Sequence, residues 1–452
     1  MLKTVSLLQT EGYELEKAFD YQKRWIALYE VIAMLLIKKP LRELTINDRY
    51  QIRQGLTMEQ FEVLRQEHGE ELGAIYEEVN PVGDLMSLET RLNHLLETVN
   101  IHIYQLDSGR FVLQLDYTTT IGSKWNVISK NARGIVYDLD TLEVLSLPFH
   151  KFFNVNEREE VRLEKLDLNE PGYVMEKLDG TMIHVFLDED TLYFATRGRV
   201  SKSMHNEGAS QQFLAQDGDV DRLKMWIREG YTPIFEFLLE KGHEYQHVVN
   251  YEKREIRLIA IRHRSTGAYV SPDLLDGIAK ELNVKASSFY SNKTFFNITG
   301  EALHASNFEG WVVVFPSGLF IKAKAREYMA AMEIGIVENE FDRDAVSLRK
   351  LVLNWMELDI QDDKIAQLPT NEMRDEATKA VDEIWEAIRM MKADLQVTVD
   401  AYSKESPKEF ARIINERKDI DKAKKPIIFA LRNKNEIKLK KLPPHLLKEY
   451  LA

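Results

Sequence analysis

The sequence predicts an α+β protein, with an antiparallel-sheet centre between a helical N-terminal region and a helical C-terminal region. Apolar residues recur at helical spacing near both ends of the chain, whereas short apolar runs alternate with turns from about residue 101 to 323. At 452 residues the chain is long enough for two or three domains. We therefore expect a helical extension over 1–85, a central α+β domain over 86–330 and a helical domain over 331–452.

The N-terminal region carries two helical patterns. The first has apolar residues at helical spacing, at Phe19, Trp25, Tyr29 and Ile32. Pro40 ends this pattern, because proline does not continue a helix. The second pattern runs from Met58 to Val79 and stops before Pro81. Both are expected to be helices.

The sequence pattern of the central region predicts antiparallel hairpins. Apolar runs flank turn residues, as Ile103–Leu106 and Phe111–Leu115 flank Asp-Ser-Gly. The run Leu192–Thr196 follows an Asp-Glu-Asp turn, and Pro316-Ser317-Gly318 turns the chain from one apolar run into the next. One helical interruption is expected after Ser271-Pro272-Asp273, because serine caps helices and proline suits the first helical position.

Helix dominates again after about residue 327. The segment Asn371–Tyr402 is long, polar and periodic, and Ser406-Pro407 is a second serine-proline cap. From Asp421 to the C-terminus nine Lys or Arg residues face three Asp or Glu. This basic end is compatible with contacts to nucleic-acid phosphates, and equally with a solvated helix.

Composition excludes several classes of function. The chain has no cysteine, so disulfides, thiolate catalysis and thiolate metal sites are ruled out, and a reducing, cytoplasmic setting fits. The apolar run Trp25–Ile37 contains Glu30 and is too short to cross a bilayer, so no membrane association is expected. The net charge of −13 argues against binding nucleic acid through overall charge, although a local basic groove remains possible.

The most informative motif is Lys177-Leu178-Asp179-Gly180, which has the pattern KxDG. Enzymes that attach a nucleotide to their own lysine use this arrangement. Such a lysine attacks the α-phosphate of a nucleoside triphosphate, and it must first lose its proton, because its unperturbed pKa is about 10.4. The triphosphate also needs cations near its α-phosphate. A working site should therefore supply further basic residues, a carboxylate for the ribose and a carboxylate for a metal ion.

The chain supplies each of these groups on strand-like segments. In chain order they are Arg133-Gly134, Lys151-Phe152-Phe153-Asn154, Lys177, Arg197-Gly198, Phe235-Glu236-Phe237, Glu309-Gly310-Trp311-Val312 and Lys322-Ala323-Lys324. The two last lysines are two residues apart, so they point to the same side of a strand. Taken singly, most of these residues would be ordinary surface charges, and their joint order carries the argument.

This set resembles the motifs of the covalent nucleotidyltransferases, which include DNA ligases, RNA ligases and mRNA capping enzymes. The runs Ala132–Tyr137 and His150–Glu157, with Tyr328 after Lys322-Ala323-Lys324, are similar to the T4 RNA ligase 1 family. The resemblance covers about residues 90 to 330. It implies that the central domain is an adenylyltransferase domain.

The resemblance also implies a role for each matching residue. Lys177 would be the adenylated nucleophile, with Asp179, Lys322 and Lys324 as the other catalytic residues. Glu309 would bind Mg²⁺, or Mn²⁺ in its place. The ATP-binding residues would be Glu176, Arg133, Lys151, Phe153, Gly180, Arg197, Glu236, Val312 and Tyr328.

Four positions depart from the family pattern. Arg197 stands where the family usually has lysine, which keeps the charge and changes the geometry. Ile259 and Ile261 offer aliphatic contacts where many relatives stack an aromatic ring on the base, which could loosen base selectivity. His247 lies where relatives of this type often have a basic residue, so the contact there can differ.

A rival motif is His243-Glu244-Tyr245-Gln246-His247, which spells the zinc-protease pattern HExxH. That chemistry needs a helix, so that both histidines share one face. Gly242 before the motif and Val248-Val249 after it indicate a loop that enters a strand. Zinc proteolysis is therefore not expected.

The resulting prediction is an ATP-dependent RNA ligase that joins 5′-phosphate and 3′-hydroxyl RNA ends through a lysyl-AMP intermediate. Single-stranded ends, such as a broken tRNA loop, are the expected substrate, in the cytoplasm of a cell or of a viral host. The alternatives are a DNA ligase, a GTP-dependent capping-type enzyme and a non-catalytic RNA-binding protein. The N-terminal extension has no assigned role, and its partner, if any, is open.

Overall fold

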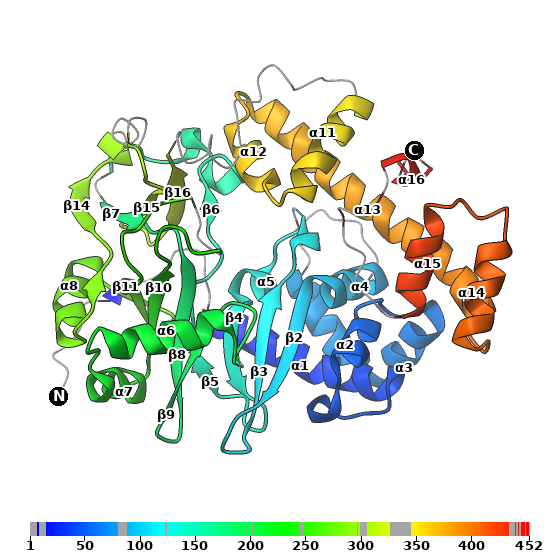
Figure 1. The fold of residues 1–452 in the computed structure, drawn as a ribbon, viewed down its shortest axis with the longest axis horizontal. Coiled ribbons are helices and arrows are strands. Elements are labelled where there is room, and N and C mark those ends of the chain that lie inside the picture. Colours follow the sequence, from blue (N-terminus) through cyan, green and yellow to red (C-terminus); the bar gives the residue numbers. More distant parts are fainter. Residues whose placement is uncertain are drawn as a thin grey trace.

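The computed structural model describes residues 7–8, 15–79, 88–122, 124–170, 172–200, 202–244, 248–295, 297–298, 305–325, 345–433, 439, 442, 444–447 and 449–451. Within this part, helices gather towards both ends of the chain and three β-sheets lie between them (Figure 1). The predicted α+β class is confirmed. The expected boundaries at 85/86 and 330/331 fall outside the described residues.

The N-terminal helices pack on the first sheet. They are α1 (Leu15–Leu36), α2 (Ile46–Ile52), α3 (Met58–Val79) and α4 (Leu88–Thr98). The expected helix over 58–79 is confirmed, with a kink at His68. Thr45 caps α2 through a reciprocal pair of hydrogen bonds with Asp48, which satisfies backbone donors that the first turn leaves free.

The first sheet shares one core with these helices. Its strands, in sheet order, are β2 (Val99–Gln105), β3 (Phe111–Tyr117), β4 (Arg133–Asp138) and β5 (Val144–Ser146). Trp25 and Ile32 of α1 are buried in the same apolar cluster as Leu113 and Tyr137. The Tyr137 hydroxyl donates to Gln22 Oε1 at 2.5 Å within this core. The helical extension therefore depends on the sheet to bury its apolar face.

The second sheet has most of its strands in the central region of the chain. Its order is β1 (Leu7–Leu8), β12 (Tyr269–Val270), β11 (Glu255–His263), β10 (Tyr231–Leu238), β8 (Thr181–Asp188) and β9 (Thr191–Ala195), with β13 (Lys285–Ala286) parallel to β11. Helices α6 (Met204–Ala215), α7 (Val220–Arg228) and α8 (Pro272–Glu281) pack against it. The expected helix after Ser271 is confirmed as α8, whereas α6 and α7 were not predicted.

The third sheet carries the KxDG lysine. Its order is β14 (Phe289–Lys293), β7 (Gly172–Lys177), β15 (Gly310–Val314), β16 (Phe320–Lys324) and β6 (Phe153–Asn154). The expected hairpin through Pro316-Ser317-Gly318 is confirmed as the antiparallel pair β15 and β16. A short helix, α5 (Val127–Asn131), precedes β4 and was not predicted.

The C-terminal helices form a core of their own. They are α11 (Ala345–Glu357), α12 (Gln361–Gln367), α13 (Asn371–Ala401), α14 (Pro407–Glu416), α15 (Lys424–Arg432) and α16 (Pro444–Leu447). The expected long helix is confirmed as α13, and Ser406 caps α14 by accepting from the Glu409 amide. In Figure 1 the long helix α13 crosses above the first sheet. None of the helices in the described ranges is long and apolar enough to cross a membrane.

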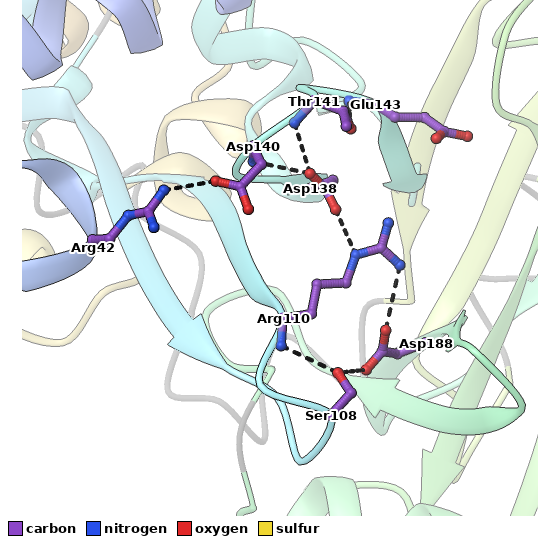
Figure 2. A network of polar contacts seen from close by, with 8 residues as sticks. All are labelled: Arg42, Ser108, Arg110, Asp138, Asp140, Thr141, Glu143 and Asp188. Atoms are coloured by element: carbon purple, nitrogen blue, oxygen red, sulfur yellow. Dashed lines mark hydrogen bonds and ion pairs between the residues drawn. The ribbon is translucent and has the colours of Figure 1, made fainter.

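A polar network ties the first sheet to the second (Figure 2). Arg110, after the β2–β3 turn, pairs with Asp138 at the end of β4 at 2.5 Å and with Asp188 at the end of β8 at 3.3 Å. The carboxylate of Asp138 also accepts from the amides of Asp140 and Thr141. Both carboxylates are buried and Arg110 is one-third exposed, so the arginine neutralises two charges that the fold removes from water.

Candidate active site

Lys177 lies at the end of β7 and forms an ion pair across the third sheet. Its Nζ is 2.6 Å from Oε1 of Glu309, which is buried directly before β15. Burial alone would lower the pKa of Lys177, but the nearby carboxylate of Glu309 opposes burial, and the net effect raises the pKa. The lysine is therefore an ammonium ion in this state, and it must give up its proton before it can act as a nucleophile.

Strand register brings the predicted lysines onto one face. In the antiparallel ladder Gly310 pairs with both Lys177 and Lys324, and Val312 pairs with Lys322. Because alternate residues share a face, Lys177, Val312, Lys322 and Lys324 all point to the same side of the sheet. They line a pocket of about 640 Å³. We call it the nucleotide pocket, and its size suits a nucleotide-sized ligand.

The motif residues after Lys177 hold its strand end in place. Asp179 Oδ2 accepts from the amides of Val248 and Val249 at 2.8 Å each, and the Asp179 amide donates to the Tyr251 hydroxyl at 2.9 Å. Gly180 is needed for a different reason. A Cβ there would lie 2.5 Å from the carbonyl oxygen of Phe237, so only glycine permits this approach of β10.

Glu236 lines the nucleotide pocket from β10, with Phe235 and Phe237 packed in the core behind it. Burial raises its pKa to about 8, although Lys177 opposes the shift. Near neutral pH this carboxyl therefore keeps its proton for much of the time, and it can both donate and accept hydrogen bonds. That is the behaviour suited to a ribose diol. Glu176 also lines the pocket, although its side chain lies on the opposite face of β7 from Lys177.

Arg133 and Arg197 line the nucleotide pocket from its other side. Arg197 pairs with Asp116 at 3.2 Å and its guanidinium lies 4.9 Å above the Tyr117 ring. A planar guanidinium makes both contacts at once, which an ammonium group does less well, and this accounts for arginine here. Gly134 has φ +95°, and a Cβ there would lie 2.9 Å from the Arg197 Cα. Glycine thus lets β4 approach the Arg197 loop.

Lys151 and Phe153 lie next to a second pocket of about 210 Å³. The ammonium of Lys151 is buried among aromatic rings, 4.9 Å from that of Trp125 and 5.0 Å from that of Phe153. Burial would lower the pKa of Lys151, but Glu157 and Asp362 raise it. Lys151 and Phe153 do not line the nucleotide pocket.

Phe152, rather than Phe153, faces the nucleotide pocket. Its ring lies 5.3 Å from the guanidinium of Arg133 and 5.7 Å from Nζ of Lys322. The two phenylalanines alternate along the chain and so face opposite sides. Lys322 is crowded by other cations, and burial together with Lys151 and Lys324 lowers its pKa to about 7.

A β-bulge changes what β11 offers to the base. Phe235 pairs with Leu258 and Ile234 with Ala260, so Ile259 has no partner across the ladder. Ile259 and Ala260 line the nucleotide pocket, whereas Ile261 is fully buried in the core. The expected aliphatic contact thus comes from Ile259 alone. Aromatic surface is supplied by Phe149, Phe152 and Tyr269, which also line the pocket.

Two residues of interest fall outside the described part: Tyr328 and His247. The described residues around the HExxH motif, 239–244 and 248–254, form turns and bends between β10 and β11, not a helix. In the described ranges no group of three or more histidine or acidic side chains is placed to hold a metal ion.

A single carboxylate, Glu309, nevertheless fits the metal that the resemblance implies. Among the described residues its Oε2 is buried without a hydrogen-bond partner, while Oε1 contacts Lys177. A hard cation such as Mg²⁺ takes oxygen ligands and keeps several waters, so one carboxylate with substrate phosphates is sufficient. The donor set at Glu309 is compatible with such an ion.

Several functional candidates were missed by the sequence analysis. Tyr251 contacts the KxDG backbone, Asp116 pairs with Arg197, and Glu157 pairs with Lys151 at 3.7 Å. Burial raises the pKa of Asp116 to about 7, although Arg197 opposes it. Asp116 and Tyr251 belong to no motif and are recognisable only once the strands are placed. Glu157 was within the recognised His150–Glu157 run, but its role was not assigned.

The site places a lysine beside a buried carboxylate and opposite further lysines on one sheet, which is the kind of centre that the sequence resemblance predicts. Comparison with known proteins narrows the class. Residues 131–329 match the sequence model of the T4 RNA ligase 1 family, described as RNA ligase. This segment is therefore similar to RNA ligases, in agreement with the resemblance seen in the motifs.

Two relatives and a solved structure are similar to parts of the chain. A putative RNA ligase from Thermovibrio ammonificans is 30% identical over 211 residues, 45% of this chain and 53% of that protein. RNA ligase 1 of bacteriophage TS2126 is 30% identical over 204 residues, which are 43% of this chain and 49% of the phage protein. The chain thus matches about half the length of these relatives. The structure of an archaeal ATP-dependent RNA ligase aligns with a TM-score of 0.40 at 14% sequence identity. The alignment covers 69% of this chain and 80% of the archaeal chain.

Proposed function

We propose that this protein is an ATP-dependent RNA ligase. The observation that carries the proposal is Lys177 in contact with buried Glu309, facing Lys322 and Lys324 across one pocket. A pure binding protein needs no lysine between two carboxylates. The family match of residues 131–329 supports RNA rather than DNA as the substrate.

The reaction would run through three displacements at phosphorus. In the first, Nζ of Lys177 attacks the α-phosphorus of ATP, its proton is lost to solvent, and pyrophosphate leaves. In the second, a 5′-phosphate oxygen of RNA attacks the same phosphorus and the Lys177–phosphorus bond breaks. In the third, an RNA 3′-hydroxyl attacks the 5′-phosphorus, AMP leaves, and the strands are joined. One set of cations serves all three steps, because each step develops negative charge on phosphate oxygens.

The pocket residues divide this work. Lys322 and Lys324 stabilise charge at the α-phosphate, Arg133, Arg197 and Lys151 hold the remaining phosphates, and Glu236 holds the ribose. Asp179 and Gly180 fix the end of the nucleophile's strand. Glu309 would hold Mg²⁺ or Mn²⁺, and such an ion would supply positive charge against the phosphate oxygens. Glu176, Val312 and Tyr328 complete the expected nucleotide contacts, and Phe153 supports the site indirectly, through its contact with the ammonium of Lys151.

The substrate we propose is RNA with 5′-phosphate and 3′-hydroxyl ends, in a single strand or a broken tRNA loop. Splayed ends reach an enclosed pocket more readily than paired ends do. A cytoplasmic setting, of a cell or a viral host, suits a chain without cysteine. The central domain, expected over 86–330, holds the chemistry, and we assign RNA presentation to the helices after 331.

The test uses one 5′-phosphorylated single-stranded RNA with a 3′-hydroxyl, incubated with ATP and Mg²⁺. We expect a circular or longer product that resists phosphatase. Parallel reactions contain nicked duplex DNA with ATP, and a 5′-diphosphate RNA with GTP. Joining confined to the DNA nick would favour a DNA ligase, and guanylate transfer alone would favour a capping-type enzyme.

A further inference from the structure

The C-terminal helices bring carboxylates onto the cations of the active site. The turn before α12 and its first residues contain Asp359, Asp362 and Asp363, and we call residues 359–363 the acidic segment. Asp363 pairs with Lys324 at 2.8 Å, and both side chains are about 15% exposed. Asp362 pairs with Lys151 at 3.6 Å. These contacts join two parts of the chain with separate apolar cores.

The second pocket lies where these parts meet. All three aspartates line it, together with the cations Lys151, Arg158, Arg197, Lys322 and Lys324. Three of these cations, Arg197, Lys322 and Lys324, also line the nucleotide pocket. A phosphate chain that reaches from one pocket towards the other therefore meets these shared cations, and one of them, Lys324, is already paired with the acidic segment.

Charge balance explains why carboxylates are present here. Closely spaced, poorly solvated cations repel one another, and this repulsion is relieved by any anion that is held among them. The pKa of Asp362 is lowered, because Lys151, Arg158 and Lys322 outweigh the opposing effect of burial. Its carboxylate is thus charged, as a phosphate group would be.

We propose that the acidic segment is an internal competitor for the phosphate-binding cations, and that a polyphosphate must displace it to occupy the site fully. The proposal rests on the proposed function in so far as the displacing anion is the triphosphate of ATP. In the resting protein Asp362 and Asp363 hold Lys151 and Lys324. Polyphosphate binding releases these contacts and loosens α12 from the central sheets, so nucleotide entry is coupled to the position of the C-terminal helices.

The first test measures binding of inorganic tripolyphosphate, without metal, by titration calorimetry of the full chain. The variant D362N/D363N keeps the side-chain shapes and removes two charges. We expect it to bind tripolyphosphate roughly fivefold more tightly than the wild type, because each lost ion pair no longer competes. The matched control is D419N, which removes an exposed carboxylate paired only with Arg417 in the described structure. Unchanged or weaker binding by the double variant, relative to this control, would overturn the proposal.

The second test asks whether the segment moves. Hydrogen–deuterium exchange of the wild type should show faster exchange of the amides in 359–367 once tripolyphosphate is added. Unchanged or slower exchange there would mean that the segment stays in place and would also overturn the proposal. Both tests are independent of catalysis. A protein that binds tripolyphosphate as expected but never acquires AMP contradicts the proposed function and leaves the competition intact.

Discussion

At the residue scale, the site depends on side chains that place Lys177 without facing the nucleotide pocket. The Tyr251 hydroxyl accepts a hydrogen bond from the Asp179 amide at 2.9 Å, and the Tyr251 ring packs beside Val249 and Ala325. The Asp179 carboxylate is fixed by two further amides. Together these hydrogen bonds define the position from which the lysine approaches phosphorus.

We expect Tyr251→Phe to slow self-adenylation roughly tenfold with little change in the KM for ATP. The substitution keeps the ring and removes only the acceptor of the Asp179 amide, so it loosens the nucleophile rather than the nucleotide contacts. The time course of AMP incorporation at several ATP concentrations separates the two parameters. Tyr290→Phe serves as control, because Tyr290 is 43% exposed. An unaltered rate for Tyr251→Phe would show that this hydrogen bond does not position Lys177.

Sequence reasoning reached the charged residues of the site but not their surroundings. Lys177, Glu236, Lys322 and Lys324 were found because the chemistry requires those residue types and because their order along the chain resembles the family motifs. Tyr251 and Asp116 act through backbone amides and ion pairs between distant strands, which no local pattern records. The adjacent pair Phe152-Phe153 illustrates the limit: one ring had to face the site, and only the placement of β6 decides which.

At the element scale, the Arg110 network joins the ends of strands from two sheets (Figure 2). The sequence predicted the hairpins but not this junction, because its partners are 28 and 78 residues apart from Arg110. The unpredicted helix α7 is different, since Asp219 caps it and Leu223, Trp226 and Ile227 follow helical spacing. That signal was present in the sequence and was overlooked among the strands. Helix α6 buries only Asn206, Ala209 and Phe213, so its pattern is weak.

We expect Asp138→Asn to lower the free energy of unfolding by about 1–3 kcal/mol. The buried oxygen that accepts from Arg110 Nε is replaced by an amide group that carries no charge and can present a donor to the guanidinium, so the ion pair is lost. Chemical denaturation monitored by circular dichroism measures the effect. Asp140→Asn is the control, because Asp140 is 61% exposed in its pair with Arg42 and should change stability by less than about 0.5 kcal/mol. Equal effects of the two substitutions would contradict a structural role for the network.

At the scale of the whole molecule, buried neutral histidines make the fold sensitive to acid. Burial lowers the pKa of His184 from 6.5 to about 4 and that of His94 to about 3, with Arg389 and Lys124 adding to the shift of His94. His184 donates from Nε2 to the carbonyl of Thr196 at 3.2 Å and contacts Ser146 Oγ through Nδ1. It thus supports the loop that carries Arg197.

The sign of the pH effect follows from these shifts. Between pH 6.5 and pH 4 these histidines are protonated in the unfolded chain and still neutral in the folded chain. Their contribution to stability is therefore complete above pH 6.5 and is lost as the pH falls through this window. At pH 5 each such histidine removes about 1–2 kcal/mol of stability. Unfolding free energies at several pH values measure the slope, and His184→Gln should reduce it. If the unfolding free energy depends on pH equally in the wild type and in the variant, His184 does not contribute to the acid sensitivity.

The most direct measurement of the central claim is the intact mass of the protein after incubation with Mg²⁺ and ATP, with GTP and NAD in parallel. We expect a gain of one AMP from ATP alone in the wild type and no gain in Lys177→Ala. A wild-type protein that is free of AMP beforehand and gains none from ATP would contradict it, as would an adduct that persists in Lys177→Ala.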